Sequence, residues 1–242
     1  MPDLPWELFV AAFVIGVSKT GFSGISLLGV VLLTQAYGAR DQSGLALPML
    51  IVADLLVYKA FRGHGSWKEV WYLLPPCLAG VVAGAWLLGN LDNATARPWI
   101  GAIILFMALL LPLRARFPKM AAWLARAPTF TLAMGFAGGL ATTMANAAGP
   151  IISIYLLARG LGKMDLLGTG ARFFLLINIV KVPFLAFQGL IIPETLWANV
   201  WAIPTILAGV YVGRQLVHRV PERVFAWMIA GFSVLGGINL LR

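Results

Sequence analysis

The sequence is poor in charged residues, and above all in acidic ones. Only 11% of its 242 residues are charged, with nine Asp and Glu against 18 Lys and Arg, whereas charged residues make up about 25% of a typical soluble domain. Hydrophobic residues make up 60% of the chain, and the mean hydropathy is +0.89. This composition excludes a soluble protein and predicts an all-α, polytopic membrane protein, because a helix of roughly 20 apolar residues crosses a bilayer.

Residues that carry most enzymatic and metal chemistry are scarce as well. Cys77 is the only cysteine, so no disulfide can form within the chain. His64 and His218 both lie in predicted loops, with no Cys, Asp or Glu at the spacing of metal ligands. No glycine-rich segment has the context of a phosphate-binding loop. We therefore expect neither a catalytic site nor a metal or other cofactor.

The net charge of +9 does not indicate a nucleic-acid-binding protein. The basic residues fall singly between apolar segments instead of forming a stripe on one face. Such a distribution is typical of the Lys and Arg that orient a membrane protein. The expected surroundings are a lipid bilayer, with no nucleic acid as partner.

Apolar segments of two kinds divide the chain. Those with the length of ordinary spans are 45–60, 70–89, 98–113, 171–188, 195–213 and 224–241. Two others, 8–37 and 129–158, are about 30 residues long, which is too long for one upright helix and too short for two full spans. Small and polar residues interrupt them at 16–24 and 138–150. We predict that each is a re-entrant helical hairpin, which returns to the side of the membrane from which it entered.

The distribution of Lys and Arg favours this topology. With two hairpins, four loops lie on one side and hold thirteen Lys and Arg, against three on the other side. These loops are 59–69, 114–126, 159–172 and 214–223. If each interrupted segment crossed once, the two sides would hold eight each. Because Lys and Arg accumulate in cytoplasmic loops, we predict an inner-membrane protein with both termini in the periplasm and only Lys19 and Lys181 as basic residues within the membrane.

The chain also carries an internal repeat. The pattern P-x2-LAGV-x2-G occurs at 75–84 and again at 204–213, and the two interrupted segments match at an offset of about 123 residues. Each half then comprises one hairpin and three spans, so the second half is inverted relative to the first. The predicted repeats are 1–113 and 129–242, joined by a cytoplasmic loop at 114–128. Inverted repeats are typical of secondary transporters, whose sites lie at interrupted helices.

The first interruption contains a lysine, Lys19, in the middle of an apolar segment. A lysine at that depth costs about 2.5–3.5 kcal/mol on insertion scales, so it is usually paired, hydrated or functional. It is flanked by Ser18, Thr20 and Ser23, and irregular backbone at this depth faces either protein or a water-filled cavity. These residues are candidates for substrate binding, although a lysine that reaches the membrane surface is an alternative.

The second interruption contains Thr142, Thr143 and Asn146, followed by Gly149 and Pro150. Proline suits the first turn of a new helix. Two helix N-termini would then point their positive ends toward the middle of the membrane, one from each interruption, and together with Lys19 they favour an anionic substrate. The alternative for the hydroxyl groups is packing between helices.

Two further charged residues lie deep in ordinary spans. Asp54 and Lys181 are at similar depths in spans that correspond in the repeat, and Asn178 is one turn before Lys181. A buried Asp54–Lys181 pair would partly neutralise the cost of both charges. Asn178 and Lys181 are therefore further candidates for substrate binding, and Asp54 is a candidate for coupling transport to a proton or another ion. A purely structural pair is the alternative, and both possibilities stay open.

Three motifs resemble the sulfite exporter TauE/SafE family of small bacterial membrane transporters. They are the sequence GVSKTGFSG at 16–24, the duplicated LAGV-x2-G spans, and GTGARFFLLINIVKVPF at 168–184. The resemblance covers nearly the whole chain. It departs near residue 43, where Gln42, Ser43, Gly44 and Leu45 stand in place of the family's small-Thr-Ser-Leu pattern.

What the resemblance implies is export of a small sulfur-containing anion, such as sulfite or an organosulfonate, across the cytoplasmic membrane, coupled to an ion gradient. The expected partners are that anion, the bilayer and, as an option, a second copy of the chain. A channel, a non-transporting sensor or assembly factor, and a membrane-embedded transferase are the alternatives. A transferase would need several His, Asp or Glu near one interface, whereas the chain has only two His and nine acidic residues.

Overall fold

The computed structural model describes residues 4–22, 24–116, 127–216 and 238. Its helices are α1 (Trp6–Lys19), α2 (Ser26–Tyr37), α3 (Asp41–Ala60), α4 (Trp67–Gly89), α5 (Asn93–Arg116), α7 (Pro128–Ala145), α8 (Gly149–Ala158), α9 (Lys163–Phe187) and α10 (Pro193–Leu216). No strand occurs among the described residues, so the predicted all-α fold is confirmed. Helices cover five of the six predicted ordinary spans, and the sixth, 224–241, lies outside the described residues apart from Ile238.

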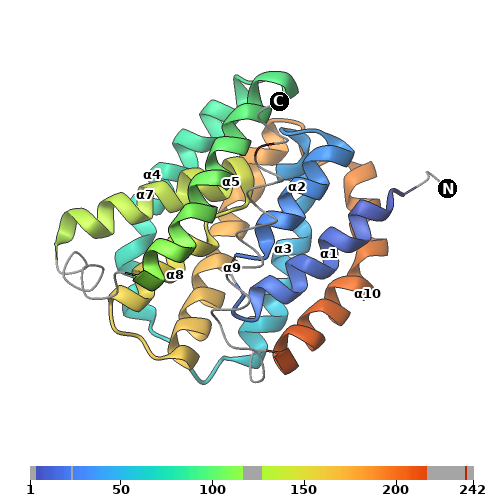
Figure 1. Ribbon diagram of the computed structural model, residues 1–242. Coiled ribbons are helices and arrows are strands. Elements are labelled where there is room, and N and C mark those ends of the chain that lie inside the picture. The colour runs from blue at the N-terminus through green and yellow to red at the C-terminus, as the bar shows by residue number, and fades with distance from the viewer. Residues whose placement is uncertain (1–3, 23, 117–126, 217–237, 239–242) are drawn as a thin grey trace.

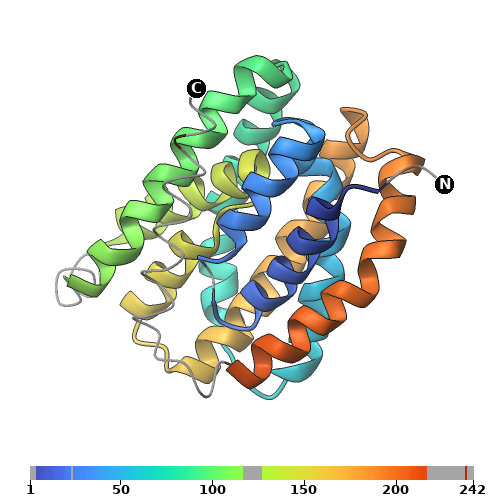
Figure 2. The same cartoon turned by 45° about the vertical axis from the view of Figure 1, so that its right-hand side comes forward.

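Helix lengths fall into two groups. Within the described part of the chain, α3, α4, α9 and α10 are long and apolar enough to cross a membrane. In contrast, α1 has 14 residues, α2 has 12 and α8 has 10, whereas a span needs about 20. Each of the two interrupted segments is therefore a pair of helices with a break between them. Figure 2 shows α1 and α2 as two arms joined at such a break.

The breaks arise where the backbone leaves the right-handed helical region. Gly21 has φ 123°, and Asn146 has φ 49°, the left-handed conformation that glycine and asparagine adopt at least cost. Asn146 ends α7, and its N–H donates to the carbonyl of Thr142. Pro150 then lies in the first turn of α8, where a missing N–H does no harm.

The first helix of each interrupted segment packs against a long helix of the other half of the chain. Figure 1 shows α4 and α7 side by side on one flank and α1 and α10 on the opposite flank, with α3 and α9 between them. In both pairs the two helices run parallel, since residues later in one helix contact residues later in the other.

Glycines allow these close approaches. A Cβ at Gly80 would overlap the carbonyl oxygen of Phe136, and one at Gly139 would overlap that of Cys77. Likewise, a Cβ at Gly209 would overlap the carbonyl oxygen of Phe13. Gly80 and Gly209 are the glycines of the two LAGV motifs, so the repeated motif has the same packing role in both halves.

Helices α3 and α9 cross the centre of the molecule in opposite directions. Near the start of α3, Gly44 contacts the backbone of Leu190, which follows the end of α9. Past the other end of α3, the N–H of Ser66 donates to Thr169 Oγ1 in the second turn of α9 (2.8 Å). Arg172 adds to this connection by donating to the carbonyl of Arg62 (3.0 Å). These two long helices thus frame the central region.

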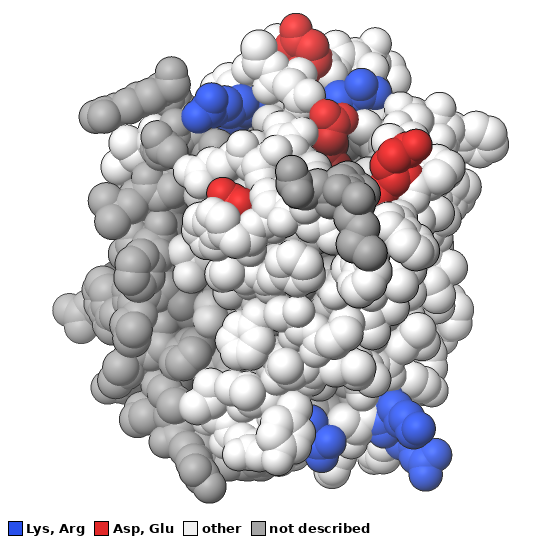
Figure 3. Space-filling model, turned by 90° about the vertical axis from the view of Figure 1, so that its right-hand side faces the viewer, with Lys and Arg blue, Asp and Glu red and all other residues white. Residues whose placement is uncertain are grey.

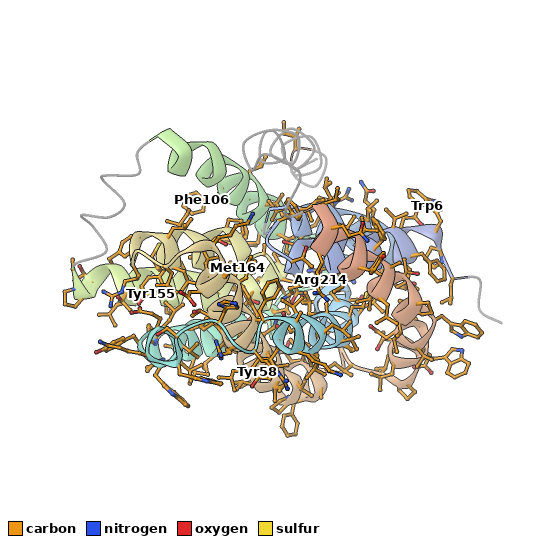
Figure 4. The ribbon with its side chains drawn as sticks, turned by 90° about the horizontal axis from the view of Figure 1, so that it is seen from below. Trp6, Tyr58, Phe106, Tyr155, Met164 and Arg214 are labelled. Atoms are coloured by element: carbon orange, nitrogen blue, oxygen red, sulfur yellow. The ribbon has the colours of Figure 1, made fainter. Side chains whose placement is uncertain are left out.

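The two ends of the molecule differ in charge. Glu7, Asp41 and Glu194 lie in the first turns of α1, α3 and α10, which share one end, and we call it the acidic end. Lys59 and Arg214 lie in the last turns of α3 and α10, at what we call the basic end. Figure 3 shows acidic side chains gathered at one end and only basic ones at the other on the face in view. Figure 4 looks at the basic end, where Tyr58, Met164 and Arg214 lie near the middle.

Candidate functional site

The two helix breaks meet around a central cavity of about 60 Å³, which is room for a few water molecules or one small ion. Its polar lining comes from both breaks and from α3, α8 and α9: Ser18, Lys19, Ser26, Asp54, Thr142, Asn146, Ser153 and Asn178. Its apolar lining includes Leu50, Ile152, Leu156, Leu166, Leu167 and Phe174. Residues far apart in the sequence therefore build one site.

Lys19 ends α1 and pairs with Asp54 of α3. Its Nζ lies 2.8 Å from Asp54 Oδ1, and it also lies 4.4 Å from the centre of the Phe174 ring, within the range of a cation–π contact. The side chain of Lys19 is 12% exposed, whereas that of Asp54 is 1% exposed. Both residues line the cavity, and of the two side chains that of Lys19 is the more exposed.

A chain of hydrogen bonds connects this pair to the second break. Asn178 Nδ2 donates to Asp54 Oδ2 (2.7 Å), and its Oδ1 lies 3.4 Å from Lys181 Nζ. Lys181, which is fully buried, donates to the carbonyl of Thr142 and to Asn146 Oδ1, both at 2.7 Å. Lys181 therefore holds the end of α7 through neutral oxygens.

The ion pair that we considered between Asp54 and Lys181 is thus replaced by one between Asp54 and Lys19. The reason is geometric, because the break after α1 brings Lys19 directly beside α3, while Asn178 lies between the carboxylate and Lys181. Sequence position alone puts Lys181 and Asp54 at matching depths. It does not reveal that the break after α1 places Lys19 beside Asp54.

Two of the predicted hydroxyl groups serve helix packing. Thr20 Oγ1 donates to the carbonyl of Val17 (2.8 Å), and Thr143 Oγ1 donates to that of Gly139 (2.9 Å). Both side chains are fully buried, and neither lines the cavity. Ser18 Oγ also bonds within its own helix, to Ile15 (2.7 Å), but it does line the cavity. Ser23 lies outside the described residues.

Gln42 and Ser43 belong to the site's surroundings and were not among the predicted site residues. Ser43 Oγ and Gln42 Nε2 donate to the carbonyl of Met144, at 2.7 and 3.1 Å. Asn146 Nδ2 in turn donates to the carbonyl of Ser43 (3.4 Å). Two adjacent polar residues at the start of an apolar span were the signal that could have identified them.

The cavity extends from the site toward the basic end. Its lining includes Asp54 and Asn178 and continues to Leu156 near the end of α8 and Leu166 near the start of α9. On the side of the acidic end, the contacts of Gln42 and Ser43 with Met144 connect α3 to the second break. The site is therefore more nearly continuous with the basic end than with the acidic end.

Comparison with known protein families gives one match, to the family described as Sulfite exporter TauE/SafE, over residues 8–240. Neither the curated proteins nor the solved structures that were compared contain a match to this chain.

Proposed function

This chain belongs to the sulfite exporter TauE/SafE family, a family of multi-pass membrane transporters and not of enzymes, and we propose that it is a secondary transporter of sulfite or an organosulfonate. In this proposal the substrate binds in the cavity between the two helix breaks, and the protein exposes that cavity to each side of the membrane in turn.

The observation that carries the proposal is the charge of the site. When Lys19 and Lys181 are protonated and Asp54 is ionised, these three hydrogen-bonded residues have a net charge of +1. Lys19 lines the cavity and is the most exposed of the three, at 12%, against 1% for Asp54 and 0% for Lys181. A small monoanion beside Lys19 would pair with a positive charge, and the polar lining from Ser18, Asn146 and Asn178 offers hydrogen bonds to its oxygens.

The helix ends at the breaks favour the same sign of ligand. Carbonyls at the end of α7 receive hydrogen bonds from side chains, Thr142 from Lys181 and Met144 from Ser43. The starts of α2 and α8 have no side-chain cap, and residues at both starts, Ser26 and Gly149, line the cavity. Positive helix ends therefore border the cavity while negative ends are occupied, an arrangement that suits an anion.

The packing of the helices supports alternating access between two inverted repeats. We propose that α1–α2 and α7–α8 are re-entrant hairpins, which enter from the acidic and the basic end respectively. The equivalent pairings of α1 with α10 and α4 with α7, and the opposed α3 and α9, are the relations expected of inverted repeats. Rocking of one half against the other would then open the site to either side.

We further propose that the basic end faces the cytoplasm, following the preference of Lys and Arg for that side, with the termini in the periplasm and the protein in the inner membrane. Exposed tryptophans lie near both ends, Trp67 and Trp71 at the start of α4 and Trp86 near its end, as expected for side chains at the two membrane interfaces. Because the cavity extends toward the basic end, the structure would correspond to the inward-facing state.

The test is transport into proteoliposomes that contain the purified protein. We expect saturable uptake of labelled sulfite and of at least one organosulfonate by the wild type, and loss of this uptake in Lys19→Gln. The control is Lys59→Gln, which removes an exposed lysine at the basic end and should take up the anions as the wild type does. Wild-type protein that moves none of these anions would contradict the transporter assignment and favour a sensor or assembly factor. Normal uptake by Lys19→Gln would contradict the site.

A further inference from the structure

The lysine assigned to the substrate already has an anion bound to it, the carboxylate of Asp54. Lys19 Nζ lies 2.8 Å from Asp54 Oδ1, a distance typical of a charge-assisted hydrogen bond. A substrate anion that reaches Lys19 must therefore either replace the carboxylate or share the ammonium with it. In both cases Asp54 and the substrate compete for one positive charge.

On the basis of the proposed function, we infer that Asp54 couples transport to protons: the bound anion takes over Lys19, and the Asp54 carboxylate takes up one proton from the solution to which the cavity is open. The proton forms an O–H bond with Asp54, Lys19 stays an ammonium, and no other bond is made or broken. Anion and proton then cross the membrane together, one of each per cycle.

The surroundings of Asp54 explain why it takes up a proton. Once Lys19 has turned to the substrate, the remaining partner of the carboxylate is the neutral amide of Asn178. Lys181 cannot take the place of Lys19 while Asn178 lies between them and while Thr142 and Asn146 hold its ammonium. An ionised carboxylate that is 1% exposed and lacks a cation is unstable, and protonation removes its charge.

Charged groups on the neighbouring helices do not alter this reasoning. Lys19 faces Asp54 from α1, and Lys181 is the nearest cation on α9. The charged residues of α10, Glu194 and Arg214, lie in its first and last turns. No Asp, Glu, Lys, Arg or His occurs in α2 or α7, the other helices packed on α3, where Tyr37 at the end of α2 is the titratable residue.

The charge of the cluster also stays constant under this scheme. Without substrate, two lysines and one carboxylate give a net charge of +1, and a monoanion bound together with one proton leaves that value unchanged. Transport of a monoanion is then electrically neutral. The membrane potential would not drive it, and transport would follow the combined concentration gradients of the anion and the proton. Each anion that leaves the cell would remove one acid equivalent.

The first experiment counts protons by isothermal titration calorimetry in detergent, with sulfite and methanesulfonate as probes and buffers of different ionisation enthalpy. The variant is Asp54→Asn, which keeps the shape and a hydrogen-bonding group for Lys19, and the control is Asp41→Asn on the same helix. We expect the wild type and Asp41→Asn to take up about one more proton per bound anion than Asp54→Asn. The difference between variants cancels any proton that the probe itself exchanges.

The same scheme predicts the pH dependence of binding. Since binding takes up a proton, the Kd of the wild type for methanesulfonate should rise about tenfold per pH unit where Asp54 is ionised in the free protein, whereas the Kd of Asp54→Asn should stay level. Equal pH dependence and equal proton uptake in the two proteins would overturn the inference while leaving the transporter assignment intact.

A second measurement uses the wild type alone and does not depend on the folding of a variant. Uptake of methanesulfonate or sulfite into proteoliposomes should acidify the lumen and should not respond to a potassium diffusion potential set with valinomycin. Uptake that follows the potential and carries no proton would contradict the coupling role of Asp54. If the wild type neither binds nor moves any anion, the proposed function fails first and this inference fails with it.

Discussion

The two helix breaks are built from similar residues but hold their charge differently. The first break supplies its own lysine, Lys19, which reaches into the cavity and pairs with Asp54. The second break has no charged residue and instead receives the fully buried Lys181 from α9. The two lysines at comparable places therefore differ in their surroundings. Lys19 lines the cavity, where a ligand could reach it, whereas Lys181 donates hydrogen bonds to the end of α7.

The largest difference should appear when both lysines receive the same substitution. Lys181→Gln shortens the side chain that donates to two buried oxygens, and each oxygen left without a partner costs about 1–3 kcal/mol. In Lys19→Gln the Asp54 carboxyl can take up a proton, as it does in the proposed cycle, and can still form a hydrogen bond with the glutamine amide, so no buried charge is left without a partner. We expect both variants to lose transport, but only Lys181→Gln to show a large fall in Tm, measured by tryptophan fluorescence in detergent. An equal or larger fall in Lys19→Gln would contradict the distinction between the two lysines.

The next effect concerns the glycines that bring each break against the opposite half. Gly80→Ala and Gly209→Ala would each place a methyl group into a backbone carbonyl, and overpacking of this kind costs about 1–3 kcal/mol. Equal losses of Tm at the two positions would support equivalent packing in the two halves. Gly63→Ala serves as the control because no atom lies within 4 Å of its added methyl group. A loss at only one of the two LAGV glycines would contradict the equivalence.

A smaller effect separates the two roles of Asn146. Asn146→Gly keeps the left-handed backbone at φ 49° but loses the oxygen that accepts from Lys181. Asn146→Ala loses the oxygen and also strains the backbone, at a further cost of about 1–2 kcal/mol. Thermal unfolding should therefore rank wild type above Asn146→Gly and Asn146→Gly above Asn146→Ala. The reverse order of the two variants would show that the left-handed turn is not what ends α7.

The smallest effect is expected at the threonines that stand side by side at the end of α7. Thr143→Val removes a hydroxyl that bonds within its own helix and lies outside the cavity. The free energy of unfolding should therefore change by less than about 1 kcal/mol, and anion affinity should not change. Thr142→Val alters the lining of the cavity and should weaken anion binding several-fold, as measured by calorimetry. If Thr143→Val weakened anion binding more than Thr142→Val, the anion would bind on the other face of α7 and the proposed site would be wrong.

Sequence patterns predicted more of the fold than of the site. The interrupted segments, five of the ordinary spans and the lining residues Lys19, Thr142, Asn146 and Asn178 follow from hydropathy and from the cost of a charge in an apolar segment. The partners of the charged residues do not follow from these patterns. The break after α1 turns Lys19 toward α3, so Asp54 pairs with Lys19 and not with Lys181.

For Gln42 and Ser43, the sequence pattern could have marked the two residues as unusual but could not have predicted their hydrogen-bond partner. Their hydrogen bonds join the start of α3 to the carbonyl of Met144, about a hundred residues later in the chain. Such contacts depend on how the second break is placed against α3, which local composition does not encode. Thr20 and Thr143 illustrate the opposite case, since polar residues beside a break can face the packed side of the helix.

The most direct test of the central claim is to locate the bound anion. Selenite has the shape and charge of sulfite, and selenium scatters anomalously, so crystals grown with it would report the position of the ion without assumptions about transport. We predict an anomalous peak inside the central cavity, within hydrogen-bonding distance of Lys19 Nζ and between the two helix breaks, and no such peak in Lys19→Gln. An ordered selenium atom elsewhere in the membrane-embedded region, with the cavity empty, would contradict the account.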